Sequence, residues 1–204
     1  MSLLLFENTN EFIKLPMPDA NVVYNVSFLP PTEAKNLFEY LLSTIPWQQD
    51  QITVFGKTHL QPRLTALFAT NNKPYRYSNV IMHPHKMPPV LQELLASINK
   101  HCDVAFTTCL ANLYRDGQDS NGWHADDEKE LGSNPIIASL SLGEARWFHF
   151  KHKTDKSLKK KVWLTSGSLL IMGDGTQENW LHQVPKSKKI TNPRINLTFR
   201  KILE

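Results

Sequence analysis

In the segment Pro193-Arg194-Ile195-Asn196-Leu197-Thr198-Phe199-Arg200, polar and apolar side chains alternate without a break from Arg194 onward. Successive side chains of a β-strand point to opposite faces, so this alternation predicts a strand with one apolar and one polar face. The apolar set, expected to face a core, is Ile195, Leu197 and Phe199. The polar set on the opposite face is Arg194, Asn196, Thr198 and Arg200.

The segments before this strand carry similar patterns. Short runs rich in β-branched and aromatic residues are typical of strands, and several follow residue 104. They cover residues 105–115, 135–142, 145–152, 161–165, 168–172 and 181–184, and the last strand covers 194–201. Many strands in succession predict a compact β-sandwich or jelly roll.

Two amphipathic helices are predicted before these strands. In the first, which opens at Thr32 as the N-cap, apolar residues recur at helical spacing, and the second runs from about Pro88 to Lys100. The remaining N-terminal sequence predicts an irregular arm over the first twenty residues, a short strand over 21–26, and extended segments over 51–57 and 63–72. The fold class is therefore mostly β with flanking helices (α+β), in which a jelly-roll core is braced by the N-terminal helices.

The composition bounds the class of protein. The chain has 204 residues, of which 41% are hydrophobic and 21% charged, as expected for one globular domain with a substantial core. No apolar run is long enough to cross a membrane, and the N-terminus lacks the basic leader of a signal peptide. We expect a monomer that is not secreted and that is cytoplasmic or chromosome-associated, in the nucleus if the source is eukaryotic. Cys102 and Cys109 lack the spacing of a zinc module and are expected to be reduced core thiols.

Charge is distributed unevenly along the chain. Residues 1–145 carry 10 Lys/Arg against 15 Asp/Glu, whereas residues 146–201 carry 13 against 3. A basic C-terminal third is a candidate surface for a polyanion, and its lysines would contact phosphates. The alternative is a solvated, Lys-rich hairpin that aids solubility. These lysines are Lys151, Lys153, Lys156, Lys159, Lys160, Lys161, Lys186, Lys188 and Lys189.

A second stretch, Asn121-Gly122-Trp123-His124-Ala125-Asp126-Asp127-Glu128, places an imidazole and a carboxylate one residue apart. At the end of an extended strand, His124 and Asp126 can face the same point. With His182 as the third ligand, two imidazoles and one carboxylate form a set that suits a non-haem Fe(II) oxygenase. Two alternatives stay open, a chance His-x-Asp in a polar loop and a zinc site with the same ligands, as in a hydrolase.

The polar face of the 194–200 strand suggests what such a site would bind. Arg194 and Arg200 lie on it, and guanidinium groups pair bidentately with carboxylates. An iron triad next to a clamp for a dicarboxylate suggests 2-oxoglutarate as cosubstrate and argues against the zinc hydrolase. Asn112 and Tyr114, which share one face of the 105–115 strand, would bind the same molecule. The alternatives are a solvated strand face and half-buried residues with local hydrogen bonds.

Together these motifs resemble the AlkB family of Fe(II)/2-oxoglutarate dioxygenases, which reverse N-alkylation damage in nucleic acids. The motifs are Asn112-x-Tyr114, His124-x-Asp126, His182 and Arg194-x-Asn196-x-Thr198-x-Arg200. The branch that acts on duplex DNA is also similar at Val54-Phe55-Gly56-Lys57, Pro62-Arg63, Tyr75-Arg76-Tyr77-Ser78 and Asp127-Glu128. The resemblance implies a double-stranded β-helix with residues 105–204 as the catalytic core. Residues 1–104 would supply the arm, the helices and hairpins that recognise the nucleotide.

The resemblance also implies a role for each matched residue. Fe(II) and the catalytic step would be assigned to His124, Asp126 and His182. The 2-oxoglutarate site would consist of Asn112, Tyr114, Arg194, Asn196, Thr198 and Arg200. Asn112, Tyr114 and Arg194 would take the far carboxylate, and Arg200 would lie near the oxo-acid end. The substrate would be contacted by Phe55, Gly56, Lys57, Tyr75, Arg76, Tyr77, Asp127 and Glu128.

The implied activity is the oxidative demethylation of 1-methyladenine and 3-methylcytosine in DNA, which consumes O₂ and releases formaldehyde and succinate. A base inside a duplex must be flipped out, and an aromatic wedge such as Phe55 can fill the gap in the stack. Each of these substrate residues has a structural alternative. Phe55 would pack on its own protein, Tyr75 and Tyr77 would lie in a strand core, and residues 127–128 would form an exposed acidic turn. The substrate alternatives are single-stranded DNA, RNA or a protein side chain, and a further one is a non-catalytic nucleic-acid-binding module.

Overall fold

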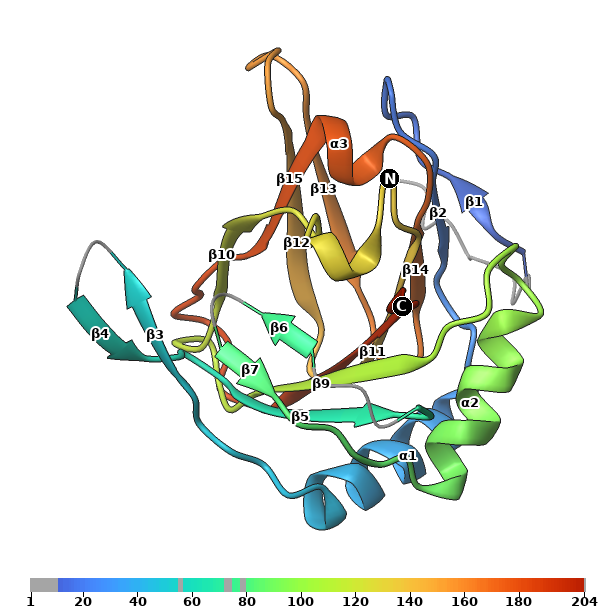
Figure 1. Ribbon diagram of the computed structural model, residues 1–204, viewed down its shortest axis with the longest axis vertical. Helices are drawn as coiled ribbons and strands as arrows, with labels where there is room; N and C mark the ends of the chain where they lie inside the picture. Colours follow the sequence, from blue (N-terminus) through green and yellow to red (C-terminus); the bar gives the residue numbers. More distant parts are fainter. Residues whose placement is uncertain (1–10, 55–56, 72–74, 78–79, 204) are drawn as a thin grey trace, which may run out of the picture.

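Two β-sheets that pack face to face form the body of the protein, and helices cover the outer side of the larger sheet (Figure 1). The structure, a computed structural model, describes residues 11–203 except 55–56, 72–74 and 78–79. The larger sheet has the order β1-β2-β14-β11-β16-β9-β5-β8, and the smaller sheet has the order β10-β15-β12-β13.

The eight-stranded sheet draws its strands from the whole length of the chain. They are β1 (Ile13–Lys14), β2 (Val22–Asn25), β5 (Leu64–Ala69), β8 (His85–Lys86), β9 (Thr108–Tyr114), β11 (Ile137–Gly143), β14 (Leu169–Met172) and β16 (Arg194–Arg200). The strands of the smaller sheet are β10 (Asn121–His124), β12 (Arg146–His152), β13 (Lys159–Leu164) and β15 (Trp180–Val184). Two separate hairpins pair β3 (Gln51–Val54) with β4 (Lys57–Leu60) and β6 (Tyr75–Tyr77) with β7 (Val80–Met82).

Strand β16 lies at the centre of the larger sheet, between β9 and β11 and antiparallel to both. Its apolar side chains Ile195, Leu197 and Phe199 are fully buried, in a cluster with residues of the helices α1 (Pro31–Thr44) and α2 (Pro89–Asn99). This confirms the predicted apolar face. The polar face of β16 is buried as well, so the alternative of a solvated face is wrong.

A second apolar cluster fills the space between the two sheets. It joins residues of the larger sheet, such as Leu110 and Met172, to Phe148, Phe150 and Trp180 of the smaller one. Alternation along β12 explains this, because Phe148 and Phe150 point inward while His149 between them does not. The smaller sheet therefore closes the polar face of β16 off from water.

The helix and strand predictions hold in outline and differ in detail. Helix α1 begins at Pro31 with Pro30 as the N-cap residue and no side-chain cap, so the prediction of Thr32 as the N-cap is wrong. Proline suits the first turn of a helix, where its missing N–H would have no partner. The N-terminal arm contains the short strand β1, and the strands β7 and β8 are not apparent from the sequence pattern, because two or three residues show no period.

Cys102 and Cys109 are free thiols, and Cys109 is fully buried, as expected for core thiols. Burial raises the pKa of the Cys102 thiol to about 11, which keeps it protonated. Among the described residues, no helix is long and apolar enough to cross a membrane.

We expect Leu197→Ala to lower the free energy of unfolding by about 2–5 kcal/mol, because it opens a cavity under the central strand. Leu203→Ala is the matched control, because Leu203 is 45% exposed and its truncation should change stability little. Urea unfolding of both variants measures the difference. Equal losses would contradict the position of β16 at the centre of the core.

Candidate metal centre and cosubstrate site

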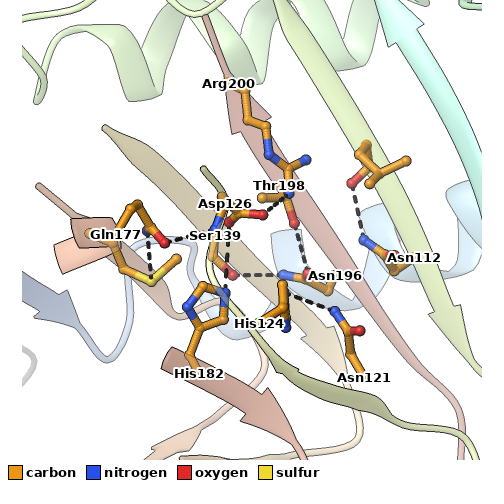
Figure 2. Close-up of polar contacts among 12 residues, drawn as sticks. Asn112, Asn121, His124, Asp126, Ser139, Gln177, His182, Asn196, Thr198 and Arg200 are labelled. Atoms are coloured by element: carbon orange, nitrogen blue, oxygen red, sulfur yellow. Dashed lines mark hydrogen bonds and ion pairs between the residues drawn. The ribbon is translucent and has the colours of Figure 1, made fainter. Parts of the chain in front are cut away.

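Three candidate ligands converge between the two sheets (Figure 2). His124 ends strand β10, Asp126 follows two residues later, and His182 lies on β15 directly opposite His124 in the antiparallel pair. One ligand atom of each residue lies within 4.8 Å of the others. The structure thus brings together the three residues that the sequence predicts as metal ligands.

The hydrogen bonds of His124 orient it for metal binding. Its Nδ1 lies 2.7 Å from the carbonyl oxygen of Gly122, to which it donates as the Nδ1–H tautomer. Nε2 is then unprotonated, and it accepts a hydrogen bond from Nδ2 of Asn121 at 3.1 Å. Such a backbone acceptor behind a ligating histidine is common in metal sites, because it fixes both the tautomer and the ring.

Asp126 is held by one partner on each side. Nη2 of Arg200 donates to Oδ1 at 2.7 Å, and the backbone N–H of Asp126 donates to Oε1 of Gln177 at 3.0 Å. The second carboxylate oxygen, Oδ2, lies 3.7 Å from Nε2 of His182. One oxygen is therefore tied to Arg200, and the other points to the place where a cation would bind.

The electrostatics of the three residues suit a metal ion. Burial raises the pKa of the Asp126 carboxyl, but Arg200 and the two imidazoles outweigh this effect and hold that pKa well below its usual range. Burial lowers the pKa of His182 to about 3 and also lowers the pKa of His124. An ionised carboxylate and two neutral imidazoles are the protonation states in which these groups bind metals.

A buried polar network follows the inner face of β16. Nδ2 of Asn196 donates to Oγ of Ser139 at 2.8 Å, and Oγ1 of Thr198 donates to Oδ1 of Asn196 at 2.9 Å. Nη2 of Arg194 donates to Oγ of Ser141 at 2.8 Å. The two serines lie on the same face of the sheet as these residues, and Asn196 and Arg194 each bond to the serine diagonally across, since the register pairs Ser141 with Asn196 and Ser139 with Thr198.

Arg194 has donors to spare. It is 1% exposed, and within the described part of the chain its Nε and Nη1 atoms have no hydrogen-bond partner of good geometry. Burial lowers the pKa of Arg194 to about 10, which still leaves it cationic at neutral pH. A buried cation with unsatisfied donors is costly unless an anion binds to it, and a carboxylate has two oxygens for the purpose.

A cavity extends from the candidate metal centre along this network. Its lining includes all three candidate ligands together with Asn112, Tyr114, Asn196, Thr198 and Arg200. Tyr114 connects the cavity to Arg194, whose guanidinium carbon lies 5.3 Å from the centroid of the tyrosine ring. The donor set and the unsatisfied guanidinium therefore fit an Fe(II) ion and a dicarboxylate such as 2-oxoglutarate.

The structure adds residues that the sequence analysis did not assign to the site. Arg63 is buried and donates from Nε to Oδ1 of Asn112 at 2.9 Å and from Nη1 to Oδ1 of Asn121 at 3.2 Å. Gln177, in helix α3 (Thr176–Asn179), holds the backbone of Asp126. Ser139 and Ser141 alternate with leucines on β11, and this pattern could have revealed them. The contacts of Arg63 join it to residues about 50 positions further along the chain, and no local pattern around Arg63 predicts them.

The predicted substrate residues are only partly placed. Asp127 is exposed and lies 3.6 Å from Nζ of Lys153, and the half-buried Glu128 directly precedes the 3₁₀ turn η1 (Lys129–Leu131). Tyr75, Arg76 and Tyr77 form β6, and Lys57 begins β4, but the positions of their side chains lie outside the description. Phe55 and Gly56 lie outside the described residues. The substrate roles of all these residues stay predictions.

Comparisons with known proteins agree with this geometry. Residues 21–200 match the model of the 2OG-Fe(II) oxygenase superfamily. Over 205 residues the chain is 38% identical to the alpha-ketoglutarate-dependent dioxygenase alkB homolog 3 of Bos taurus, with 96% of this chain and 71% of that protein covered. This chain belongs to the AlkB family. The AlkB-family protein is also 37% identical over 181 residues to the DNA oxidative demethylase ALKBH2 of Homo sapiens, covering 84% of this chain and 69% of that one.

Solved structures show the same fold. The AlkB-family protein superposes on OsALKBH1 with a TM-score of 0.67 at 18% identity, covering 94% of this chain and 100% of the other. A prolyl-4-hydroxylase of Pseudomonas putida gives a TM-score of 0.57 at 16% identity, covering 88% and 92%. The predicted jelly roll is confirmed. The family is that of Fe(II)/2-oxoglutarate dioxygenases, so the AlkB-family protein is such an enzyme, and the alternatives of a zinc hydrolase and a non-catalytic module are excluded.

We expect the iron-free protein to lose stability as the pH falls from about 6.5 toward 3. The folded-state pKa of His182 is about 3, whereas the ordinary pKa of a histidine is 6.5, so below pH 6.5 the unfolded chain binds a proton that the folded chain does not. Urea unfolding as a function of pH measures this slope.

His182→Gln should flatten the slope between about pH 6.5 and 4, and His83→Gln, at an exposed histidine, should leave it unchanged. A remaining loss at lower pH is expected from Asp126, whose pKa is also lowered in the folded state. A slope that persists in full in His182→Gln would contradict the prediction.

We expect Arg194→Lys to raise the KM for 2-oxoglutarate by about tenfold or more, because lysine keeps the charge but loses the bidentate fork. Succinate formation at varied 2-oxoglutarate concentration measures this effect. Arg115→Lys is the matched control, since Arg115 is exposed and pairs with Asp119. An unchanged KM in Arg194→Lys would remove Arg194 from the cosubstrate site.

Proposed function

We propose that this AlkB-family protein is an oxidative demethylase that repairs N-alkylated bases in DNA, with 1-methyladenine and 3-methylcytosine as substrates. The observation that carries the proposal is the convergence of His124, Asp126 and His182 in one cavity, whose lining residue Tyr114 packs against the buried, partly unsatisfied Arg194. The 37% identity to a protein named DNA oxidative demethylase ALKBH2 supports DNA as the polymer.

The chemistry of the site follows from its residues. When bound, Fe(II) together with 2-oxoglutarate and O₂ supplies the hydroxylation of the alkyl carbon, which releases succinate and CO₂ and leaves a hydroxymethyl group that departs as formaldehyde. His124, Asp126 and His182 would hold the metal. Asn112, Tyr114 and Arg194 would receive the far carboxylate of the cosubstrate, Arg200 would lie near its oxo-acid end, and Asn196 and Thr198 would keep the strand face polar.

Aromatic side chains exclude water from this chemistry. The ring of Phe148 stacks on His182 with centroids 5.2 Å apart and an interplanar angle of 25°, and Phe150 lies edge-on at 6.1 Å. Both phenylalanines are buried, so the inner side of His182 faces apolar atoms rather than solvent. A dry, pre-organised site protects the reactive centre from side reactions.

A cationic base such as 3-methylcytosine favours a pocket with carboxylates. Asp127 and Glu128 follow the metal ligand Asp126 directly, and we propose that they receive the flipped base together with Tyr75 and Tyr77. Phe55, Gly56, Lys57 and Arg76 would contact the duplex from the hairpins. We further propose a monomeric, single-domain protein, cytoplasmic or chromosome-associated, in which residues 1–104 recognise the nucleotide and residues 105–204 form the catalytic core.

The test is formaldehyde release from an oligonucleotide with one 3-methylcytosine, offered as single strand and as duplex. We expect release to require Fe(II) and 2-oxoglutarate and to disappear in His124→Ala. Tyr40→Ala, on the outer helix α1, should retain full release and serves as the control. If wild-type protein consumes 2-oxoglutarate but releases no formaldehyde from either DNA form, the substrate must be sought among RNA or protein side chains.

A further inference from the structure

The outer face of the smaller sheet carries a set of residues that the proposed chemistry does not use. Alternation on β12 and β13 turns Phe148, Phe150, Val162 and Leu164 inward. The residues between them face away from the candidate metal centre. These outward residues are Trp147, His149, Lys151, Lys159, Lys161 and Trp163.

Two tryptophans dominate this outer face. Trp147 lies directly opposite Trp163 in the β12–β13 pair, and the two side chains are 48% and 39% exposed. Their ring centroids are 4.9 Å apart with an interplanar angle of 57°, so the rings touch without covering each other. Neighbouring large aromatics that stay this exposed are uncommon on a soluble surface unless they bind something.

A basic groove of about 470 Å³ runs beside the tryptophan pair. Its other wall is the segment 185–190, part of the connection 185–193 between β15 and β16, and its cationic lining includes Lys161, Lys186 and Lys189. Within the described part of the chain, no Asp or Glu lines this groove and no ion pair involves the three lysines. The groove therefore combines exposed aromatic rings with uncompensated positive charge.

The second wall is held in place before any ligand binds. Nη2 of the buried Arg146 donates to the carbonyl of Pro185 at 2.7 Å, and the backbone N–H of Ser187 donates to the carbonyl of Gly117 at 2.7 Å. A Cβ atom at Gly117 would lie 1.9 Å from the carbonyl oxygen of Ser187, so this close approach requires glycine. A fixed wall lowers the entropic cost of binding.

We propose that this groove is a second nucleic-acid site, which holds unpaired bases of a single strand against Trp147 and Trp163 while Lys161, Lys186 and Lys189 contact its phosphates. Exposed aromatic rings stack on bases of any sequence, and lysines follow the backbone, which together is the chemistry of single-strand binding. The inference rests on the proposed function for the nature of the polymer and deepens it by naming unpaired strand as a ligand outside the active site.

The geometry favours a single strand over a duplex. Inside a duplex, each base stacks on its neighbours and its faces are covered. Only an unpaired base with an uncovered face can stack on a tryptophan ring. The groove and the candidate metal centre lie on opposite faces of the same sheet, because His182 is directed inward from β15. The bases held in the groove are thus different from the base that reacts at the candidate metal centre.

The experiment uses the full chain and an unmethylated oligothymidylate of about twelve nucleotides, a length within the range that single-strand-binding folds occupy. Binding is measured by quenching of tryptophan fluorescence and by a label on the oligonucleotide, for wild type, Trp147→Leu and Trp163→Leu. Leucine keeps apolar volume on the sheet but removes the stacking face. Tyr40→Leu is the control, since Tyr40 is similarly exposed on α1.

We expect each tryptophan variant to bind the oligothymidylate about tenfold more weakly, with blunt duplex affinity little changed and thermal unfolding close to that of wild type. Lys161→Gln and Lys189→Gln should each flatten the dependence of binding on salt. Unchanged affinity in both tryptophan variants would overturn the proposal, as would equal losses on single strand and duplex.

The groove could instead hold a second copy of the protein. In that case sedimentation would show a dimer for wild type and a monomer for the tryptophan variants, with unchanged oligonucleotide affinity. This result would also overturn the proposal. Failure of the dealkylation itself is distinguishable. Wild-type protein that binds the oligothymidylate through the tryptophans but releases no formaldehyde from methylated DNA would refute the proposed function and leave the groove as a binding site.

Discussion

The ion pair between Arg200 and Asp126 connects the central strand of the fold to the candidate metal centre. Both side chains are buried, and Nη2 lies 2.7 Å from Oδ1. A buried carboxylate without a partner would cost several kcal/mol, and removal of one member of such a pair typically destabilises a protein by about 3–5 kcal/mol. Arg200 therefore fixes the loop after β10, keeps Asp126 ionised and leaves its other oxygen for a cation.

The position of β16 makes this arrangement possible. As a central strand covered on both sides, it must bury four polar side chains as well as three apolar ones. Asn196 and Thr198 meet the requirement by bonding to each other and to β11, and Arg200 meets it through Asp126. Arg194 meets it only in part: its Nη2 donates to Ser141, whereas its Nε and Nη1 have no partner of good geometry among the described residues. The unsatisfied donors lower stability and are the physical reason to expect a bound carboxylate.

The smaller sheet serves two tasks because its side chains alternate. Its inner face supplies His182 and the phenylalanines that shield it, and its outer face presents the Trp147–Trp163 pair with the lysines. The segment 185–190 belongs to the connection 185–193, which leaves β15 two residues after His182 and enters β16 at Arg194. Nucleic acid held on the outer face would thus touch a segment anchored at both ends in site strands.

The sequence alone determined the features that depend on local period and on motif. Alternation in residues 194–200 predicted the strand and its two faces, and His124, Asp126 and His182 were identifiable as a ligand set by their chemistry. Contacts between residues far apart in the sequence were not identifiable in this way. The bond from Arg63 to Asn112, the contact between Trp147 and Trp163, and the cavity itself each join residues from segments that are distant in the sequence or lie on different strands. Tertiary structure decided these features, because side-chain period is a property of one segment, whereas register and burial depend on which segment packs against it.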